Sequence, residues 1–232
     1  MHAAPAAVAF ICSGLLVCTG CATNPGLPAS QPESEVPTVR SITLALRPMP
    51  GMEMVTPGPA AAGAVTGLLG YAITASEMTK EGNAIVQKYQ VDDPAVAIGN
   101  SLRDQVAAND RMVAKDSAGV RVTSLYIRDV AKAYPGSSEI LDVRTTQWVV
   151  MYLPFDFMHY GVQYGVEATL YDARKHEVLA SATCSHDPKR SDGAPTHEEL
   201  LENNAAQLKI LSAKAAERCV AEILPRLLGR AK

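Results

Sequence analysis

The stretch YGVQYGVEATL, residues 160–170, places an apolar residue at every even position and small or polar residues at most odd positions. This period of two is typical of a β-strand with one buried face. After the polar residues 172–175, the alternation returns at the even positions from Val178 to Cys184. The two segments predict an antiparallel hairpin whose inward face packs against a core.

Further strands are predicted upstream of this hairpin. Residues 140–152 are rich in β-branched and aromatic side chains, which favours a strand that is bent or bulged. Residues 40–46 alternate apolar with polar or small residues and end at a turn rich in proline. Val120 and Val122 indicate a further short strand.

Helical patterns accompany the strands. Asp93 is placed as an N-cap before Pro94, and an apolar face of Ile98, Leu102 and Val106 follows. A shorter helix is predicted over residues 127–134, before a Pro-Gly pair.

The last predicted helix is the longest. Thr196 and Glu199 form a capping box, and the helix they open is expected to run to about residue 224. We therefore expect an α/β (α+β) fold, with a mixed, largely antiparallel sheet of about four to five strands. Helices cover this sheet, including the long C-terminal helix.

The N-terminal residues resemble an export signal. Residues 3–17 are almost wholly apolar and are followed by the small residues Thr19 and Gly20. Such a run is too short for a stable membrane span and is typical of a cleaved secretory signal, here residues 1–20.

The sequence VCTGC, residues 17–21, resembles a bacterial lipobox, although that pattern usually has Leu where Cys18 stands. The resemblance implies cleavage before Cys21 and acylation of that cysteine, and two or more acyl chains anchor a protein stably to a lipid membrane. Ala22 follows rather than Asp, which in such lipoproteins implies delivery to the outer membrane. The protein is then expected to face the periplasm.

The remaining chain divides into a tether and one domain. Residues 21–39 are rich in Pro and Ser and lack apolar periodicity, so they predict a flexible tether. Residues 40–232 suit a single α/β periplasmic domain, with a Gly/Ala-rich segment at residues 57–78. The formal net charge of −3 gives no basic footprint for nucleic-acid binding.

Two cysteines follow Cys21 in the chain, Cys184 and Cys219. Cys184 falls on the inward face of its predicted strand, and Cys219 falls on the apolar stripe of the last helix, so both point at one interface. Two cysteines in an exported chain suggest a disulfide. A pair of small buried thiols is the alternative.

The run VAKAYPGSSEILDV, residues 130–143, combines a helix end, a tight turn and the start of a strand. With the Gly/Ala segment GLLGYAI at residues 67–73, it resembles proteobacterial lipoproteins that have an α/β domain similar to the TolB N-terminal domain and the curli-secretion lipoprotein CsgG. The resemblance covers about residues 40–228 and rests on the order of elements. It implies an α/β fold, an envelope location and an assembly or scaffold role, and it transfers no catalytic residue.

Signals for catalysis are weak. The sequence contains no P-loop, GxSxG, HExxH or dinucleotide-binding motif. One group of metal-ligand residue types has a spacing that fits no familiar zinc pattern: Cys184, His186, Asp187 and His197. Asp156 and His159 lack a third group in view and are interpreted as a loop pair. We expect a protein that is not an enzyme and binds neither a metal nor a cofactor.

The segment WVVMYLPFDFMHYGVQY, residues 148–164, holds the only Trp and two of the three Phe. Three of its aromatic residues are expected in the core: Trp148, Tyr160 and Tyr164. The turn at residues 153–158 differs, because connecting loops normally face water and are polar. Its apolar residues indicate a contact surface for a partner or for lipid, with packing over a core edge as the alternative: Phe155, Phe157 and Met158.

Three functional hypotheses follow. The first is a non-catalytic outer-membrane lipoprotein that acts as a structural or adaptor component of an envelope complex, with an envelope protein as its partner. The second is a ring-forming export or pore component like the curli lipoprotein, which would be a homo-oligomer. The third is a periplasmic ligand-binding or hydrolytic domain, which a deep pocket lined by polar groups would favour.

Overall fold

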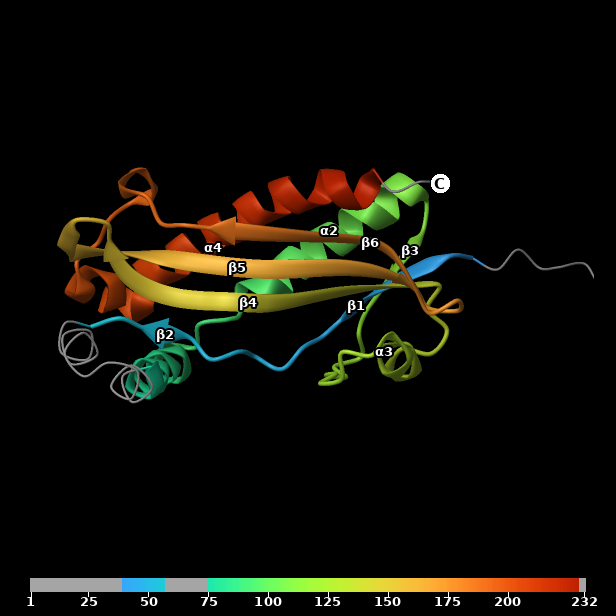
Figure 1. Ribbon diagram of the computed structural model, residues 1–232, viewed down its shortest axis with the longest axis horizontal. Coiled ribbons are helices and arrows are strands. Elements are labelled where there is room, and N and C mark those ends of the chain that lie inside the picture. Colours follow the sequence, from blue (N-terminus) through green and yellow to red (C-terminus); the bar gives the residue numbers. More distant parts are fainter. Residues whose placement is uncertain (1–38, 57–74, 230–232) are drawn as a thin grey trace, which may run out of the picture. The chain divides into compact units, whose positions relative to one another are not determined.

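Figure 1 shows the computed structural model of the chain, which describes residues 39–56 and 75–229. These residues form a mixed sheet of six strands in the order β3-β1-β4-β5-β6, with β2 paired to β4 beside this path. The strands are β1 (Ser41–Ala45), β2 (Glu53–Met54), β3 (Val113–Lys115), β4 (Glu139–Leu153), β5 (Asp156–Asp172) and β6 (Glu177–His186).

The sheet has a parallel part and an antiparallel part. β1 runs parallel to β3 and β4, and β2 also runs parallel to β4. The three longest strands, β4, β5 and β6, pair antiparallel in sequence order. The expected α/β class and mixed sheet are confirmed. The short strands β2 and β3, with two and three residues, bring the number to six in the described chain.

The hairpin prediction is confirmed along β5, because its even-numbered residues from Tyr160 to Leu170 are all at least 97% buried. In β6 the prediction holds for Ala182 and Cys184 but is wrong for Val178, which is 59% exposed. A register shift explains the error: Leu170 pairs with Ala180, whereas the next residue of β5 pairs with Val178. The extra residue in β6 is a bulge, and one inserted residue moves the preceding side chains to the opposite face.

Two other strand predictions need correction. All five residues of β1 are buried, not only the alternate ones, because this strand lies between two others and is covered on both faces. The strand expected at Val120 and Val122 is absent from the described chain, where Arg121 makes only a single bridge to Leu46. The residues that pair with β1 are instead those of β3, at the end of the preceding helix.

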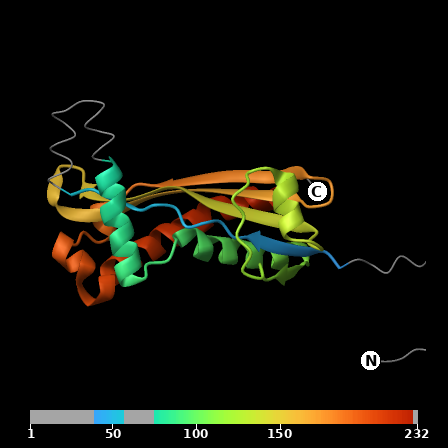
Figure 2. The same ribbon diagram turned by 90° about the horizontal axis from the view of Figure 1, so that it is seen from below.

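Two helices cover one face of the sheet, α2 (Pro94–Asp110) and α4 (His197–Leu228) (Figures 1 and 2). α4 packs on β5 and β6, and α2 packs on β1 and β4. The predicted cap is present, since the Asp93 carboxylate accepts a hydrogen bond from the Ala95 N–H at 2.9 Å. The apolar face predicted for this helix forms part of the main core, with Ile98, Leu102 and Val106 fully buried.

Two further helices lie at opposite ends of the sheet in Figure 2: the helix of residues 75–89 and α3 (Ile127–Ala133). α3 covers a second, smaller core that contains Ala45, Val130 and Tyr134. The helix of residues 75–89 packs close to the chain that enters β2, where Gly82 faces the backbone of Met52. The remainder of the Gly/Ala-rich segment, up to residue 74, lies outside the described residues.

The C-terminal helix begins at the predicted capping box, in which Thr196 and Glu199 exchange hydrogen bonds of 2.9 and 3.4 Å. It is not the continuous helix that the sequence predicted. The backbone leaves helical geometry from Glu202 to Ala205, and Asn203 and Asn204 adopt positive φ values of 50° and 61°. Asparagine tolerates this region better than most residues, so the Asn pair divides α4 into a short first turn and a long second part.

Candidate contact surface

The turn between β4 and β5 consists of two residues, Pro154 and Phe155, because Leu153 and Asp156 still pair across it. Phe155 has a φ of 62°, a conformation that is normally occupied by Gly or Asn in such turns. A bulky side chain in this region is strained, by roughly 1–3 kcal/mol. The Phe155 side chain is nevertheless fully exposed. Strain and exposure together mark this residue as one whose role is not packing within the described domain.

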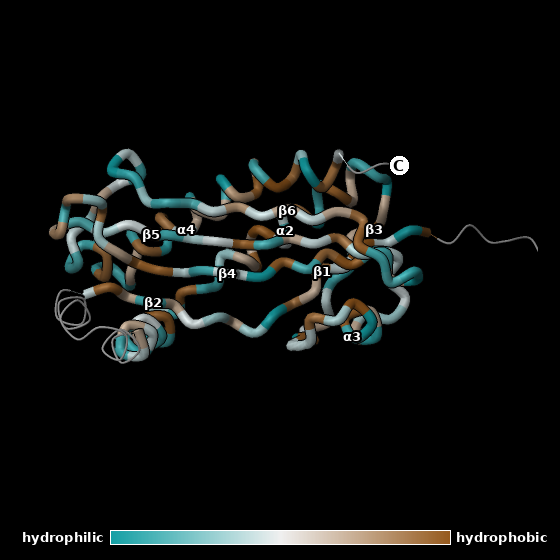
Figure 3. Tube along the Cα trace, viewed as in Figure 1, coloured by the Kyte–Doolittle hydropathy of each residue, from teal (hydrophilic) through white to brown (hydrophobic). Residues whose placement is uncertain are grey.

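Two neighbours extend the apolar surface. Phe157 and Met158 are 77% and 69% exposed, and hydrophobic residues are visible where β4 and β5 turn in Figure 3. We call Phe155, Phe157 and Met158 the hairpin tip. The aromatic residues expected in the core behave differently, since Trp148, Tyr160 and Tyr164 are each at most 3% exposed. The tip residues are thus exposed in the described domain, whereas the other three aromatic residues belong to the core.

An aromatic series connects the hairpin tip to the interior. The Phe157 ring meets the Tyr152 ring edge-on at 5.9 Å, and Tyr152 lies 4.7 Å from the Tyr160 ring. Tyr160 in turn lies 5.7 Å from the ring of His197, in the first turn of α4. Each such ring pair contributes about 0.5–1.5 kcal/mol to stability beyond the effect of its buried area. These contacts therefore stabilise the strand ends that carry the hairpin tip.

A cavity of about 450 Å³ lies beside the tip, lined by Phe157, Met158, Tyr160 and the start of α4, together with Thr56. The ring nitrogen Nε2 of His197 is buried and has no hydrogen-bond partner among the described residues. An exposed apolar rim around a hollow is typical of a site that receives a partner's side chain.

The base of the hairpin tip is held by ion pairs. The Nδ1 atom of His159 lies 2.8 Å from both carboxylate oxygens of Asp156, and Arg190 pairs with the same carboxylate. The hydrogen bond from His159 lowers the pKa of Asp156 below its usual value, with a smaller contribution from Arg190. Asp156 and His159 do pair, but both lie at the start of β5 and not in a loop as the sequence predicted, and the missing third group is an arginine from the short 3-10 helix of residues 190–192. This arrangement clamps the start of β5 to the segment after β6 and contains no nucleophile.

A second clamp fixes the loop between β6 and α4. Asp192 is buried and receives two hydrogen bonds from Arg218 of α4, one of them at 3.2 Å, and one from the Lys189 N–H at 3.0 Å. Burial alone would raise the pKa of Asp192, but these hydrogen bonds outweigh it and hold the pKa below the usual value. His186 lies 3.6 Å from Asp192, and burial together with the Arg218 charge lowers its pKa. Sequence reasoning missed this cluster because its members are up to 32 residues apart.

The disulfide expected from the sequence is present between Cys184 of β6 and Cys219 of α4. This bond removes Cys184 from any thiol chemistry, and His186 and His197 lie in separate environments, one at the second clamp and one beside the tip cavity. The described residues contain no group of three or more His, Cys, Asp or Glu that could hold a metal ion. Cys21, the predicted lipidation site, lies outside the described residues.

Comparisons with known proteins give distant likenesses only. No family model matches the chain, and no curated protein matches it. Similar solved structures include the hypothetical protein CT253 from Chlamydia trachomatis, with 8% identity, a TM-score of 0.39 and coverage of 83% of this chain and 97% of that one.

Two other similar structures are lipoprotein GNA1162 from Neisseria meningitidis and the PelC dodecamer from Paraburkholderia phytofirmans. The first has 13% identity, a TM-score of 0.26 and coverage of 63% of this chain and 81% of that one. The second has 16% identity, a TM-score of 0.35 and coverage of 83% of this chain and 89% of that one. Likeness at this level identifies neither a family nor a function.

Proposed function

We propose that the protein is a non-catalytic outer-membrane lipoprotein that faces the periplasm and works as a structural or adaptor component of an envelope complex. The observation that carries this proposal is the hairpin tip: three exposed apolar side chains beside a cavity, on a strained two-residue turn. The lipobox-like residues 17–21 and the absence of catalytic motifs from the sequence support the location and the lack of an enzymatic activity.

The energetics favour a protein partner for the tip. Burying a Phe or Met side chain that is otherwise in water contributes about 1.5–3 kcal/mol. The three tip residues therefore offer several kcal/mol to a partner, which is the scale of an interface hot spot. The clamp of Asp156, His159 and Arg190 holds the strand in its bound conformation beforehand, so less entropy is lost on association.

The test compares two double variants in intact cells by crosslinking and identification of the crosslinked partner. Phe155→Ser with Phe157→Ser removes the apolar tip. Leu125→Ser with Tyr126→Ser is the matched control, because these residues are similarly exposed, at 62% and 78%, on a different surface. The tip variant should lose the crosslinked partner with only a small fall in melting temperature, because only the contact between the Phe157 and Tyr152 rings is lost, and the control should keep the partner. A tip variant that melts much lower, or that retains its partner, contradicts the proposal.

A second candidate is a homo-oligomeric export component, in line with the resemblance to the curli-secretion lipoprotein. β6 supports it, because this ten-residue strand ends the strand order and no strand of the described chain pairs with its outer edge. Its only residues with ionisable side chains, apart from the disulfide-bonded Cys184, stand at its two ends, Glu177 and His186. Edge strands without internal charges or proline favour pairing with another chain. Sedimentation analysis of the detergent-solubilised protein separates this candidate from a monomeric adaptor.

A further inference from the structure

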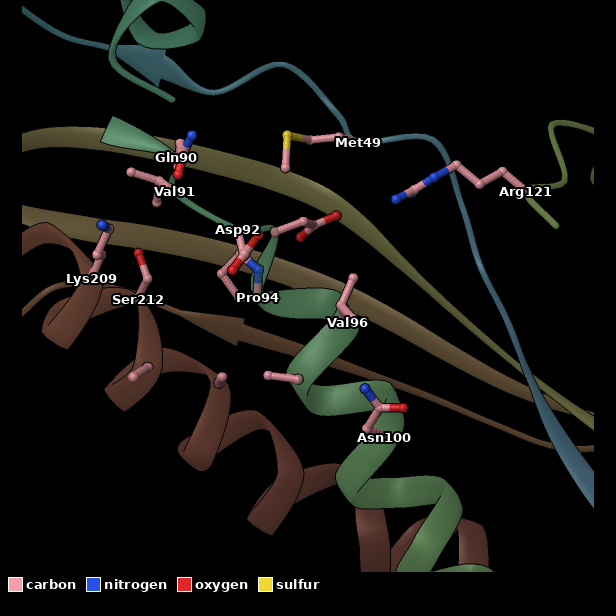
Figure 4. A pocket seen from close by; sticks show the side chains of 14 residues that line it. Met49, Gln90, Val91, Asp92, Pro94, Val96, Asn100, Arg121, Lys209 and Ser212 are labelled. Atoms are coloured by element: carbon pink, nitrogen blue, oxygen red, sulfur yellow. The ribbon is translucent and has the colours of Figure 1, made fainter. Parts of the chain in front are cut away.

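A separate cavity of about 600 Å³ lies between α2 and α4 (Figure 4), and no residue of the hairpin tip lines it. Its walls come from five segments: the loop after β1, the connection before α2, the first turns of α2, Arg121 of the segment between β3 and α3, and the middle of α4. The space exists because the facing helices present small side chains, Ala97 on α2 and Ala213 and Ala216 on α4. Cavities of this volume are large enough for a ligand of two or three residues.

Ser212 is the first sign that this cavity receives a ligand. The residue is 5% exposed, and its hydroxyl oxygen is buried without a hydrogen-bond partner among the described residues. Figure 4 shows its side chain leaving α4 toward the connection before α2. A buried hydroxyl without a partner costs about 1–3 kcal/mol. Alanine, present at the next position of the same helix, would avoid this cost.

The charged residues at the cavity form a second sign. Lys209 precedes Ser212 by three residues, which places both on one face of α4, and Asp92 lies on the opposite wall before α2. Neither Lys209 nor Asp92 forms a hydrogen bond or ion pair through its side chain with any residue of the described chain. The lining thus offers the Lys209 ammonium group with the Ser212 hydroxyl on α4, and the Asp92 carboxylate on the opposite wall. Between them lie apolar side chains, among them Val91 and Pro94. A second cation of the lining, the Arg121 guanidinium, donates a hydrogen bond to the Arg47 carbonyl oxygen at 2.6 Å.

We propose that this cavity binds a short zwitterionic peptide with apolar side chains. Its carboxylate accepts hydrogen bonds from the Ser212 hydroxyl and the Lys209 ammonium group, and its ammonium group pairs with Asp92. The apolar side chains of the peptide pack on Val91 and Pro94. The side-chain amides of Gln90 and Asn100, which also line the cavity, are suited to the peptide bond.

The experiment titrates the full detergent-solubilised chain with the dipeptide Leu-Leu, by calorimetry, and with two capped analogues. N-acetyl-Leu-Leu lacks the ammonium group, and Leu-Leu amide lacks the carboxylate. Each cap should weaken binding by about tenfold or more, which corresponds to one lost charge-assisted hydrogen bond. The Asp92→Asn variant should bind N-acetyl-Leu-Leu as tightly as it binds Leu-Leu. The Lys209→Gln variant should bind Leu-Leu amide as tightly as it binds Leu-Leu.

Three further variants locate the site and its hydroxyl. Ala213→Trp should abolish binding, since this residue lines the cavity and its exposure allows the larger side chain without disturbing the core. Ser212→Ala should weaken binding while raising the melting temperature of the free protein, because it removes an unsatisfied hydroxyl. Lys132→Gln changes an exposed side chain of α3; it is the control and should bind as the unmodified chain does.

Several results would overturn the proposal. One is the absence of Leu-Leu binding by the unmodified chain at concentrations up to about 10 mM, beyond which affinity has no specific meaning. Another is equal affinity for the free and capped peptides, which would exclude recognition of the two charges. Binding that survives in correctly folded Ala213→Trp would place the peptide elsewhere. None of these results depends on the hairpin tip or on the anchor.

Discussion

At the scale of single residues, Arg47 and Asp142 form the most buried ion pair between an arginine or lysine and a carboxylate in the described chain, with side chains 9% and 5% exposed. The Arg47 Nε donates to one carboxylate oxygen of Asp142 at 2.7 Å, and a second guanidinium nitrogen bonds the other oxygen. The same guanidinium donates to the backbone carbonyls of Val122 and Ser124 at 2.9 and 2.6 Å. The hydrogen bonds from Arg47 to Asp142 raise the pKa of the arginine further. This pair ties an irregular loop to the end of the parallel strands.

Asp142→Ala should destabilise the protein by about 3–5 kcal/mol, because the buried guanidinium of Arg47 keeps its charge and loses its partner. Chemical denaturation followed by circular dichroism measures this effect. The double variant Arg47→Met with Asp142→Leu should recover much of the loss, since two apolar groups replace the pair. A double variant less stable than Asp142→Ala would show that the four hydrogen bonds of Arg47 matter more than the uncompensated charge.

At the scale of elements, the disulfide and the second clamp hold the same two elements, β6 and α4. Cys184 and Cys219 join the strand to the helix, and one residue before Cys219 the Arg218 side chain reaches Asp192 in the connecting loop. The disulfide and the ion pair therefore stabilise the same interface. Their contributions should couple because they constrain the same segment.

Removing the disulfide by Cys184→Ala with Cys219→Ala should destabilise the domain. The sequence separation of 35 closes a loop of 35 + 1 = 36 residues, for which chain entropy gives about 3–4 kcal/mol. Thermal unfolding with and without a reducing agent measures this loss, and the unreduced protein should protect both cysteines from alkylation. Free thiols at the two positions in the exported protein would refute the cross-link.

The second clamp predicts a loss of stability on acidification. The pKa of His186 lies below its ordinary value of 6.5 in the folded chain, so the folded state binds its proton less readily than the unfolded state. The contribution of His186 to the free energy of unfolding is therefore complete above pH 6.5 and falls as the pH drops toward the pKa of the folded state. The lowered pKa of Asp192 acts in the same direction at lower pH, below about 3.8. Melting temperatures of the unmodified chain and His186→Gln between pH 7 and 5 should converge as the pH falls. Parallel curves would exclude His186 as the titrating group.

At the scale of the whole molecule, anchoring concerns residues beyond the described domain. In the part of the chain that the structure describes, no helix is long and apolar enough to cross a bilayer. The anchor that we propose is the lipid on Cys21, followed by a tether of residues 22–39.

Cys21→Ser should abolish acylation and release the protein from the membrane fraction, since no acyl chain remains to hold it. Fractionation with labelled palmitate measures both effects in one experiment. Cys12→Ser is the matched control, because this cysteine lies in the expected signal but outside the lipobox-like residues 17–21, and its loss should change neither property. A Cys21→Ser protein that still takes up palmitate and stays with the outer membrane would remove the anchor from the proposal.

The sequence by itself determined the elements whose signals are local. Alternation along residues 160–170 specified β5 and its buried face, because a strand that packs on one side must repeat every second residue. Asp93 and the Thr196–Glu199 capping box specified two helix starts, since a cap acts over three residues of chain. The same phases placed Cys184 and Cys219 at one interface, although the sequence left a pair of buried thiols as the alternative to the disulfide that the structure contains.

Only the tertiary structure decided the features that depend on distant residues. β3 pairs with β1, and residues 120–122 form no strand. Local sequence patterns could not predict this choice, because β1 lies more than 65 residues away from β3 in the sequence. Arg190 met Asp156, and Asp192 met Arg218, across gaps of 34 and 26 residues. The sequence also left the exposure of the hairpin tip undecided. An apolar turn has the same sequence pattern whether another part of the protein covers it or not. Side-chain chemistry sets what a residue can bind, whereas the packing of remote segments sets what it meets.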